Sequence, residues 1–516
     1  MRYIGSEQEW CITAKVKGEA VPDFFIDNAR FETFLRKCIG SPFLPAHIRF
    51  AAANDVDTFT WGINGSRVYK DTGSHFEIAS PIAWGPLWAT AFDIAGQTVV
   101  GKAIKVANQL WADEGIVLAA YKNNLAYEKT ETATEQLEYP EGMRLQSYGT
   151  HENYSFNKKA GQHEYFVQSA MQHLISRFFA AAGWVGIKAG KMHYFLFQRG
   201  IVTHGHVGNT TMSTREIINT RGEGLTNDKY HPRQQFIIGD ALMFEPAIFL
   251  KFGTTAMVLD LIESGYLKFP PWGNIEHPVV TFHHFTNEGL SALADVGGKK
   301  LTMVDIQERF FELAIGFYQK HRHISPRIQQ VFHLWQTVID CARQPEPYVA
   351  LSAYVDGAAK KVLIEQDMEK RGYDWNTRPS ASITRRSRDK TTTQRVIDHV
   401  KEFDLKFSWI DERGYAQRLL SLPECSVPRI VSDKTLYQAL YDPPPLTSSF
   451  GFSKFLKRAD ERGRECAQPL RAIVDCKLWY KAAIEFPNGT SHQFSTKNPS
   501  DVYGKETIEP TPLNPA

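Results

Sequence analysis

The chain has 516 residues, of which 43% are hydrophobic and 22% are charged, so it can bury a large core and should form more than one domain. Lysine and arginine together number 59 against 57 aspartate and glutamate residues, and this net charge of +2 predicts no nucleic-acid or membrane partner. The first residues lack the apolar core of a secretory signal, and no apolar run is long enough for a membrane span, so we expect a cytoplasmic protein.

The N-terminal segment alternates in character as a half-buried β-strand does. Over residues 2–16, the period of two places Glu7 and Glu9 on one face with Gly5, and Trp10 on the other face. The two acidic side chains are therefore expected to point to the same side of a sheet.

A second polar strand is predicted after a turn at Asn64-Gly65, a pair that is typical of tight hairpins. The same period of two places Arg67, Tyr69 and Asp71 on one face of this strand. This second predicted strand therefore also carries polar and charged side chains on one of its faces.

Helical spacing of apolar residues predicts several helices that cover the sheet. Pro86 marks the start of one of them and Gly115 lies beyond its end, while Thr302 and Asp305 resemble a capping pair at the start of another. The predicted helices cover residues 28–39, 86–113, 163–182, 246–264, 303–321 and 325–342.

Further strand-like runs lie between these helices. They cover residues 116–121, 192–198, 216–220, 235–239 and 277–284. Because strands and helices follow one another in mixed order rather than in strict alternation, the pattern favours an α+β fold over a doubly wound one.

Composition also predicts how the chain divides into domains. The run Pro443-Pro444-Pro445 introduces a last unit, and residues 373–395 form a polar, basic stretch that is typical of an exposed loop, at which an acidic partner could dock. We expect a large domain over residues 1–430, a small C-terminal α/β domain over 431–505 and a flexible tail over 506–516.

The strongest chemical signal is the set of acidic residues on the two polar strands. Glu7 and Glu9 are joined by Asp71 and, six residues further on, by Glu77. Carboxylates that face one space need a cation, and magnesium commonly uses a few carboxylates together with phosphate oxygens, so the set could hold Mg-ATP with Arg67 at a phosphate. The alternative, a solvated acidic strand face, is the more common use of such residues.

Several motifs occur in an order that resembles one protein family. Residues 5–10 (GSEQEW) resemble the GxExE opening of the family of Pup ligases and Pup deamidases, and residues 64–80 resemble its catalytic segment. Further similar motifs are KNN at 122–124, SYGTHENY at 147–154, IINTR at 217–221, IGD at 238–240 and KFGTTAMVLDLIE at 251–263. The resemblance implies a glutamine-synthetase-like curved β-sheet packed by helices, with a small C-terminal domain.

The resemblance also implies roles for single residues, with ATP and Mg²⁺ as cofactors. Asp71 matches the catalytic aspartate of the family. The positions that resemble magnesium ligands are Glu7, Glu9, Tyr69 and Glu77. The positions that resemble nucleotide-binding residues are Arg67, Ser80, His151, Asn153, Arg221 and Trp479, where His151 could instead hold a turn and Trp479 lies near the tryptophan that packs on adenine in the family.

The implied activity is that of a ligase. It would phosphorylate the C-terminal glutamate carboxylate of a small Pup-like protein modifier and join it to a lysine amine of target proteins; the alternative is a hydrolase that removes the modifier or deamidates its C-terminal glutamine. The DxGSH spacing at residues 71–75 and the short connection before Asn64 favour the ligase, whereas residues 251–263 and Trp335 are closer to the deamidase. A small-molecule glutamate–amine ligase and a catalytically silent binding module are further alternatives.

Some residues depart from the family pattern or fall outside it. Phe76, Ser80 and residues 222–225 differ from the family, which suggests a modifier of a divergent pathway. His283 and His284 lie in a predicted strand and would point to opposite faces, which argues against a shared metal. His204 and His206 are expected to be solvated.

Overall fold

The computed structural model describes most of the chain up to residue 442 and short pieces beyond it. The described residues are 2–16, 48–51, 59–62, 64–71, 75–129, 143–157, 164–189, 191–210, 213–221, 233–322, 324–376, 392–423, 425–442, 445, 447, 451, 454–458, 461, 470–474, 481–485, 490–495 and 505–510. The predicted helix over 28–39, the departing residues 222–225, Trp479 and most of the basic stretch lie outside them.

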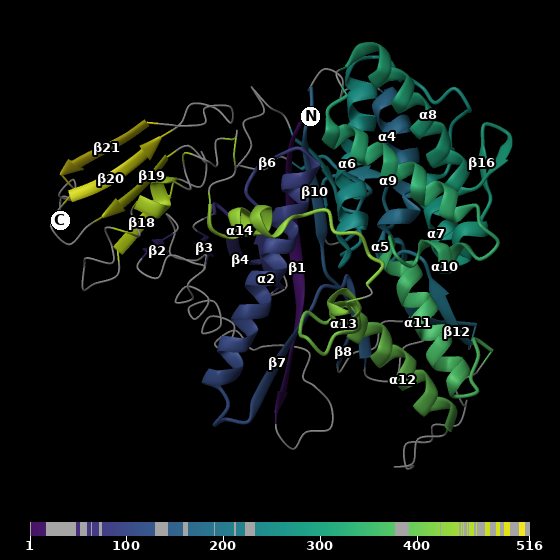
Figure 1. Cartoon of the computed structure of the whole chain (residues 1–516), viewed down its shortest axis with the longest axis horizontal. Helices are drawn as coiled ribbons and strands as arrows, with labels where there is room; N and C mark the ends of the chain where they lie inside the picture. The colour runs from purple at the N-terminus through teal and green to yellow at the C-terminus, as the bar shows by residue number, and fades with distance from the viewer. Residues whose placement is uncertain are drawn as a thin grey trace.

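A ten-stranded, mostly antiparallel sheet forms the centre of the molecule (Figure 1). Its order is β13-β14-β15-β10-β1-β5-β4-β3, and β6 and β7 also pair with β1. The long β1 (Tyr3–Val16) pairs with β10 on one side and β5 on the other, and its second half pairs with β7. The other strands are β3 (Phe59–Trp61), β4 (Arg67–Asp71), β5 (His75–Ala79), β6 (Ala83–Trp84), β7 (Ile116–Tyr121), β10 (Thr150–Ser155), β13 (Val207–Gly208), β14 (Ile218–Asn219) and β15 (Arg233–Phe236).

The predicted strands largely agree with this sheet. The runs over 2–16 and 116–121 are confirmed as β1 and β7, and the second polar strand is β4. The run over 192–198 is strand only to Phe195, and the runs over 216–220 and 235–239 overlap the short strands β14 and β15.

Four smaller sheets surround the central one. Three are hairpins, formed by β8 (Leu125–Lys129) with β9 (Met143–Ser147), β11 (Trp184–Lys188) with β12 (Lys191–Phe195), and β16 (Ala294–Val296) with β17 (Lys299–Leu301). The fourth has the order β2-β18-β19-β20-β21, with β2 (Ile48–Ala51), β18 (Leu470–Val474), β19 (Lys481–Glu485), β20 (Thr490–Ser495) and β21 (Lys505–Pro510).

This C-terminal sheet lies beside the main body in Figure 1 and takes its parallel edge strand β2 from the N-terminal part of the chain. Helix α14 (Asp433–Tyr441), just before it, packs against the main body on α2 (Pro86–Leu110). The domain limits at 430 and 505 stay predictions.

Helix α2 covers the apolar face of the central sheet. Pro86 occupies its first turn, and Gly115, with a φ of 69°, lies beyond its end as predicted. Its side chains pack against Trp10, Val68 and Phe76 from three neighbouring strands. Burying an aromatic side chain such as that of Phe76 contributes about 1.5–3 kcal/mol. This packing fixes which face of each strand is apolar, and therefore leaves Glu7, Glu9 and their neighbours on the opposite face.

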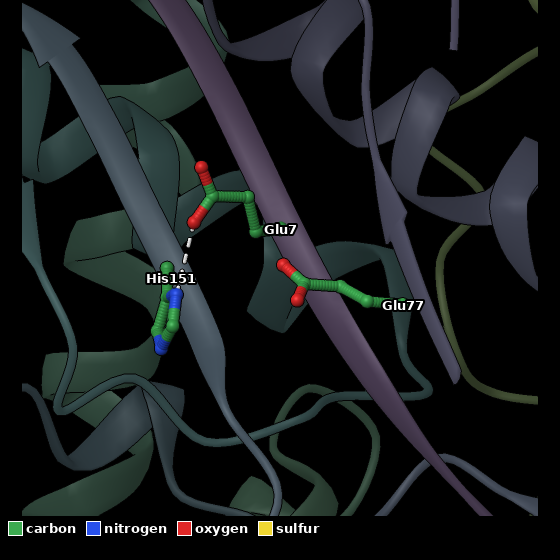
Figure 2. Close-up of side chains that lie close together, drawn as sticks. All are labelled: Glu7, Glu77 and His151. Atoms are coloured by element: carbon green, nitrogen blue, oxygen red, sulfur yellow. Dashed lines mark hydrogen bonds and ion pairs between the residues drawn. The ribbon is translucent and has the colours of Figure 1, made fainter. Parts of the chain in front are cut away.

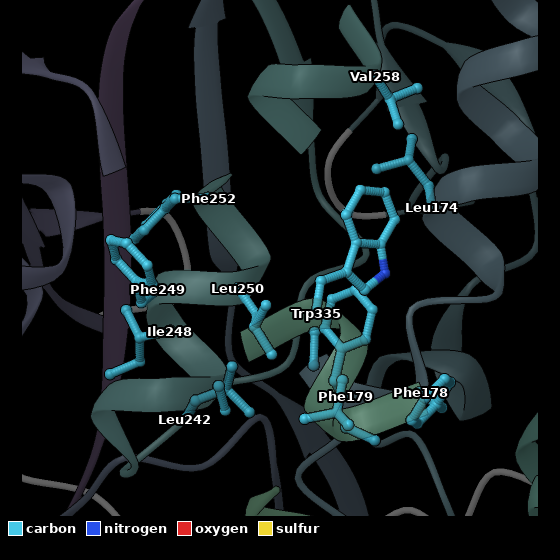
Figure 3. Close-up of a cluster of buried hydrophobic side chains, with 14 of the residues drawn as sticks. Leu174, Phe178, Phe179, Leu242, Ile248, Phe249, Leu250, Phe252, Val258 and Trp335 are labelled. Atoms are coloured by element: carbon cyan, nitrogen blue, oxygen red, sulfur yellow. The ribbon is translucent and has the colours of Figure 1, made fainter. Parts of the chain in front are cut away.

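A layer of helices forms the largest core. It contains α4 (Glu164–Ile175), α6 (Glu245–Glu263), α8 (Met303–His321) and α9 (Pro326–Ala342). Every residue of α6 from Pro246 to Ile262 is buried, as expected of a central helix that is contacted on all sides. Figure 3 shows Trp335 of α9 beside Phe179 within this core, where their ring centroids lie 6.5 Å apart.

Most predicted helices are confirmed, and one predicted strand is wrong. The helix predicted over 163–182 ends at Ile175, and the Thr302–Asp305 capping box of α8 is present. Residues 277–284 were predicted as a strand, but residues 278–284 belong to helix α7 (Pro278–Glu288), and His277 immediately precedes it. The β-branched residues of this run suggested a strand, but Pro278 at the helix start and Gly289 at its end, with a φ of 68°, are the stronger signals.

The remaining helices complete an α+β fold, as predicted. They are α5 (Arg199–Val202), α10 (Pro347–Leu351), α11 (Asp356–Lys370), α12 (Thr392–Phe407) and α13 (Tyr415–Ser421), with the 3₁₀ turns Phe178–Ala180 and Gly289–Ser291. Within the described ranges, no helix combines the length and the apolar character that crossing a membrane requires.

Candidate active site

The register of the central sheet arranges the predicted site residues in two rows. In one row, Glu7 of β1 lies opposite His151 of β10 on one side and opposite Ala79 of β5 on the other. Ala79 in turn lies opposite Arg67 of β4. The second row runs from Glu9 of β1 through Glu77 of β5 to Tyr69 of β4. Because side chains two residues apart share a face, both rows point to the side of the sheet that α2 leaves open.

Glu7 is surrounded by hydrogen-bond donors. Its Oε2 lies 2.9 Å from Nδ1 of His151 and 3.2 Å from Nε2 of Gln235, and its Oε1 lies 3.3 Å from Nδ2 of Asn153 and 3.9 Å from a guanidinium nitrogen of Arg233. Burial disfavours the charged form, but the bond and the charge of His151, followed by the charge of Arg233, outweigh it and lower the pKa of Glu7. Glu7 is therefore held ionised.

Glu9 is also held ionised, by different partners. Its Oε2 lies 2.8 Å from Nδ1 of His75 and accepts a 2.5 Å hydrogen bond from the backbone N–H of Gly149. Burial opposes ionisation, but these bonds and the charge of His75 prevail and lower the pKa of Glu9. The other ring nitrogen of His75 lies 2.6 Å from Nε2 of Gln146, which fixes the orientation of the ring.

The surroundings of Glu77 disfavour its ionised form, in contrast to those of Glu7 and Glu9. Its side chain is only 2% exposed, and its Oε1 is buried without a hydrogen-bond partner in the described part of the chain. Burial and then the charges of Glu7, Glu9 and Asp71 raise its pKa well above the usual value, and a hydrogen bond with Tyr69 acts in the opposite direction. The pKa of the Tyr69 hydroxyl is raised in turn by burial and by the charge of Glu77.

The acidic side chains converge into two overlapping groups. Glu7, Glu77 and His151 bring one potential ligand atom each to within 4.8 Å of one another, and Glu9, Asp71 and Glu77 do the same. Figure 2 shows the first group, with Glu7 and His151 joined by their hydrogen bond and the Glu77 carboxylate close by. Carboxylate oxygens that share so small a space, one of them without a partner, fit a hard divalent cation that prefers oxygen ligands, such as Mg²⁺.

Glycine at one position allows the first group to form. A Cβ atom on Gly149 would come within 2.6 Å of Nε2 of His151, so a larger residue would push the ring away from Glu7. The sequence SYGTHENY thus supplies both the ring and the space for it.

The structure brings most of the predicted site residues together. Arg67 places its guanidinium carbon 4.5 Å from the ring centre of Tyr69, and Asn153 accepts a 2.7 Å hydrogen bond from Arg233 in addition to donating to Glu7. Ser80 lies at the end of β5, where its hydroxyl accepts from the N–H of Ser6 at 2.9 Å.

Two predicted nucleotide-binding residues are less central. Arg221 is exposed just beyond β14, and its carbonyl accepts from Arg233 at 3.3 Å. Trp479 lies outside the described residues. Their predicted roles remain predictions.

Sequence reasoning missed several residues of the site. Arg233 and Gln235 of β15 alternate on the same face as Glu7, and His75 and Gln146 support Glu9. The period of two in β15 was a usable signal for the first pair. Gln146 carries no such signal, because its place depends on the packing of the hairpin β8–β9.

The histidines outside the acidic groups are placed differently. His204 and His206 are exposed, as predicted. His283 lies on helix α7 rather than on a strand, and its Nε2 is 2.6 Å from the carbonyl oxygen of Thr203. The prediction that His283 and His284 point to opposite faces of a strand is therefore wrong.

The face of β10 that points away from the site is anchored by a buried ion pair. Glu152 lies between His151 and Asn153 in sequence, and both of its carboxylate oxygens accept 2.8 Å hydrogen bonds from Arg177. Their side chains are 0% and 2% exposed, and Tyr154 also donates to Glu152 at 2.7 Å. This pair ties the strand that carries His151 to the helical core.

The fold and the site together define an α+β protein whose central sheet carries an acidic centre suited to a divalent cation. The family model described as Pup-ligase protein matches residues 43–468 of the chain. The chain therefore belongs to the Pup-ligase protein family, as the motifs predicted.

Curated relatives and solved structures agree with this assignment. The chain is 27% identical over 408 residues to the Pup-protein ligase of Mycobacterium tuberculosis (strain H37Rv), covering 78% of this chain and 81% of the relative. It is 26% identical over 407 residues to Pup-protein ligase 1 of Rhodococcus erythropolis, with the same coverage.

Two solved structures share the fold at 22% identity. One is a complex between the prokaryotic ubiquitin-like protein Pup and its ligase PafA, with a TM-score of 0.73, covering 97% of this chain and 90% of that chain. The other is the Pup ligase PafA in complex with ADP, with a TM-score of 0.67, covering 95% of this chain and 93% of that chain.

Proposed function

We propose that this protein is an ATP-dependent ligase that joins the C-terminal glutamate of a small Pup-like protein modifier to lysine side chains of target proteins. Its membership of the Pup-ligase protein family supports this proposal, as do relatives that are named Pup-protein ligases and that it matches over 81% of their length. The Pup and ADP of the structural neighbours support a Pup-like modifier and an adenine nucleotide as its ligands.

The observation that carries the proposal is the state of Glu77. A carboxylate that is 2% exposed, surrounded by the charges of Glu7, Glu9 and Asp71, is costly to ionise, yet these residues lie where a cation would remove the cost. A purely structural role would be served better by an uncharged side chain. The arrangement therefore suits an enzyme that uses a divalent cation and an anionic substrate.

We assign Mg²⁺ to this centre, with Glu7, Glu9, Tyr69 and Glu77 as the residues that would hold it. When bound, magnesium supplies positive charge to the oxygens of a transferring phosphoryl group. The open antiparallel sheet, which carries every one of these residues on one face, supports a glutamine-synthetase-like catalytic domain over residues 1–430.

The first step is phosphorylation of the modifier. A carboxylate oxygen of its C-terminal glutamate attacks the γ-phosphorus of ATP, which forms an acyl phosphate and releases ADP. Arg67 and Arg233 lie at the Glu7 end of the site, where their charges can offset those of the phosphate oxygens. We assign nucleotide binding to Arg67, Ser80, His151, Asn153, Arg221 and Trp479.

The second step joins the modifier to its target. A lysine amine attacks the acyl carbon, phosphate leaves, and an isopeptide bond forms. Because a free lysine has a pKa of about 10.4, the amine arrives mostly as an ammonium ion and must lose a proton. Asp71 lies in the group with Glu9 and Glu77, and we assign it as the base that accepts this proton.

The proposal is tested by mass spectrometry. The protein is incubated with Mg-ATP, a Pup protein ending in glutamate and a lysine-bearing protein, and we expect a covalent adduct together with one ADP and one phosphate per adduct. Failure to form any adduct, with release of the modifier from a preformed conjugate and no matching ATP consumption, would show the hydrolase instead. An adduct of free glutamate with a simple amine, formed without a protein partner, would show a small-molecule ligase.

A further inference from the structure

The motif Lys122-Asn123-Asn124 directly follows strand β7 and is buried along its whole length. Lys122 forms an ion pair with Asp93 of α2, and the side chain of Asn123 accepts a 2.5 Å hydrogen bond from Nε2 of Gln198. Burying a polar side chain is costly unless it is hydrogen-bonded. Three consecutive buried polar residues therefore indicate a specific demand at this place in the fold.

The bonds of Asn124 fall on both sides of Gly149. Its Nδ2 donates to the carbonyl oxygen of Tyr148 and to the hydroxyl oxygen of Thr150, each at 2.9 Å. The carbonyl oxygen of Asn124 accepts a 2.8 Å hydrogen bond from the N–H of Tyr148. Because Gly149 has no side chain to anchor it, its position depends on such bonds to its two neighbours.

The orientation of the Asn124 amide is fixed by its partners. Its Oδ1 accepts a 2.6 Å hydrogen bond from the N–H of Ala241. The reverse orientation would place the amide nitrogen against this N–H and the amide oxygen against the carbonyl of Tyr148. A carboxylate of the same shape could still accept from Ala241, but it could not donate to Tyr148.

The segment that orients the amide is itself held rigidly. Ala241 follows Asp240, which is buried. The carboxylate of Asp240 accepts hydrogen bonds from the backbone N–H groups of Ala182 at 2.9 Å, Gln198 at 3.0 Å and Arg199 at 2.8 Å. The KNN, SYGTHENY and IGD motifs therefore meet at Asn124, which connects the fixed segment at Asp240 to the residues around Gly149.

Gly149 transmits this connection to the acidic centre. Its N–H donates to Oε2 of Glu9 at 2.5 Å, and its carbonyl oxygen accepts from the N–H of Glu9 at 3.0 Å. The pairing of β1 with β10 ends at Gln8 and Thr150, so Gly149 lies just beyond the register that fixes β10. The hydroxyl of Thr150 adds a second link, because it donates to Oε1 of Gln8 at 3.0 Å.

We propose that Asn124 is a positioning residue, which holds Gly149 so that its N–H fixes the Glu9 carboxylate within the acidic centre. The inference rests on the proposed function, in which Glu9 is one of the residues that would hold Mg²⁺. A hydrogen bond to a carboxylate is strong but depends on the direction of the N–H, so a small rotation of the peptide at Gly149 would weaken it. Asn124 would thus affect the metal without contacting it.

The first readout reports on Gly149 directly. The sequence contains two Tyr-Gly pairs, at 148–149 and 503–504, so labelling tyrosine carbonyls with ¹³C and glycine amides with ¹⁵N selects two NMR signals. Tyr503→Phe removes the second signal and identifies that of Gly149. We expect the amide proton of Gly149 to resonate downfield because of its short bond to a carboxylate, and Asn124→Asp to shift it upfield.

The second readout is the affinity for Mg²⁺, measured by calorimetric titration of the full chain with Mg²⁺ alone. Loss of a residue that orients a metal ligand commonly weakens metal binding by about 10–100-fold, and we expect Asn124→Asp to weaken it by about tenfold or more. Thr150→Val is a second variant of nearly unchanged shape, which removes the hydroxyl between Asn124 and Gln8. It should shift the Gly149 signal in the same direction with a smaller loss of affinity.

Asn108→Asp is the matched control. Asn108 of α2 donates to the carbonyl oxygen of Leu118 at 3.0 Å and accepts from its N–H at 2.6 Å, so the variant loses the same kind of amide donor at β7. It should retain both the Gly149 signal and the Mg²⁺ affinity of the wild type.

The outcomes separate positioning from a merely structural role. A Gly149 signal that is unchanged in Asn124→Asp, or in Thr150→Val if the first variant does not fold, would overturn the proposal. So would an unchanged Mg²⁺ affinity, or an equal loss of affinity in Asn108→Asp. Absence of Mg²⁺ binding to the wild type would instead contradict the metal assigned in the proposed function, while the Gly149 signal would still test the link from Asn124 to Glu9.

Discussion

Glu9 and Glu77 are direct cross-strand partners on the antiparallel strands β1 and β5, so two carboxylates occupy one of the closest side-chain positions that a sheet offers. Like charges in such a pair destabilise a sheet. The chain accommodates them unequally, because His75 and the N–H of Gly149 hold Glu9 ionised while Glu77 Oε1 has no hydrogen-bond partner among the described residues. The pH and metal dependence of stability should follow from this difference.

The first prediction concerns the stability of the metal-free protein. The pKa of Glu77 is raised above its unfolded value of 4.5, so the folded state holds a proton that the unfolded state releases. This proton stabilises the folded state fully below pH 4.5, and the stabilisation is lost as the pH rises through the folded pKa. While Glu77 stays protonated in the folded state, the free energy of unfolding falls by about 1.4 kcal/mol per pH unit above pH 4.5. Above pH 4.5, unfolding midpoints in EDTA should fall more steeply with rising pH for the wild type than for Glu77→Gln.

Glu7 and Glu9 do not contribute to this loss of stability with rising pH. Their pKa values are lowered, so the stability they supply is present above the unfolded value and is lost only as pH falls below it. Glu369→Gln, an exposed change on α11, should behave as the wild type. Mg²⁺ should raise the midpoint of the wild type more than that of Glu77→Gln, and an equal rise in both would contradict a metal role for Glu77.

The second prediction concerns the base. Asp71→Asn should lower the rate of adduct formation by about 10²–10⁴-fold, because the amide cannot accept the proton of the attacking ammonium. Raising the pH should recover part of the rate, since more of the lysine is then neutral. The readout is adduct formation with the same substrates as above, and Asp411→Asn, in a surface pair with Arg413, serves as the control. A pH profile unchanged from that of the wild type would argue against the role of base.

The third prediction tests whether His151 supports the metal site through its contact with Glu7 or whether the imidazole ring itself is required. Its Nδ1 contacts Glu7 at 2.9 Å, and a metal-positioning role through this bond predicts that His151→Ala weakens Mg²⁺ binding by about 10–100-fold. Asparagine can place an amide N–H near the position of Nδ1, so His151→Asn should retain most of the affinity. Calorimetric titration with Mg²⁺ measures both, and equal losses in the two variants would show that the ring itself is required.

The fourth prediction concerns the buried pair beneath β10. Arg177→Met leaves the carboxylate of Glu152 buried without its cation and should lower the free energy of unfolding by about 3–5 kcal/mol. The double variant with Glu152→Gln should recover part of this loss, because no unpaired charge remains. Denaturant unfolding followed by fluorescence provides the measurement. Arg343→Met, which breaks an exposed pair with Asp305, should cost at most about 1 kcal/mol, and a similar loss at Arg177 would contradict the prediction.

Local patterns predicted the strands that carry the acidic residues because the period of two is a property of the strand itself. Glu7, Glu9, Tyr69 and Asp71 could be assigned to one face from their spacing, and the structure confirms that the strands exist. The pattern was misleading at residues 277–284, where β-branched residues suggested a strand although Pro278 and Gly289 delimit a helix. In this segment, the residues at the two helix ends indicated the structure better than the β-propensity of the residues between them.

Sequence alone determined the family, the α+β class and the acidic face, because motifs, element order and alternation are all local along the chain. Only the tertiary structure decided that Glu9 is opposite Glu77 and that Arg233 and Gln235 reach Glu7 from β15. Register and long-range pairing depend on how α2 and the helical core fix the strands against one another. No periodicity within a single strand contains that information.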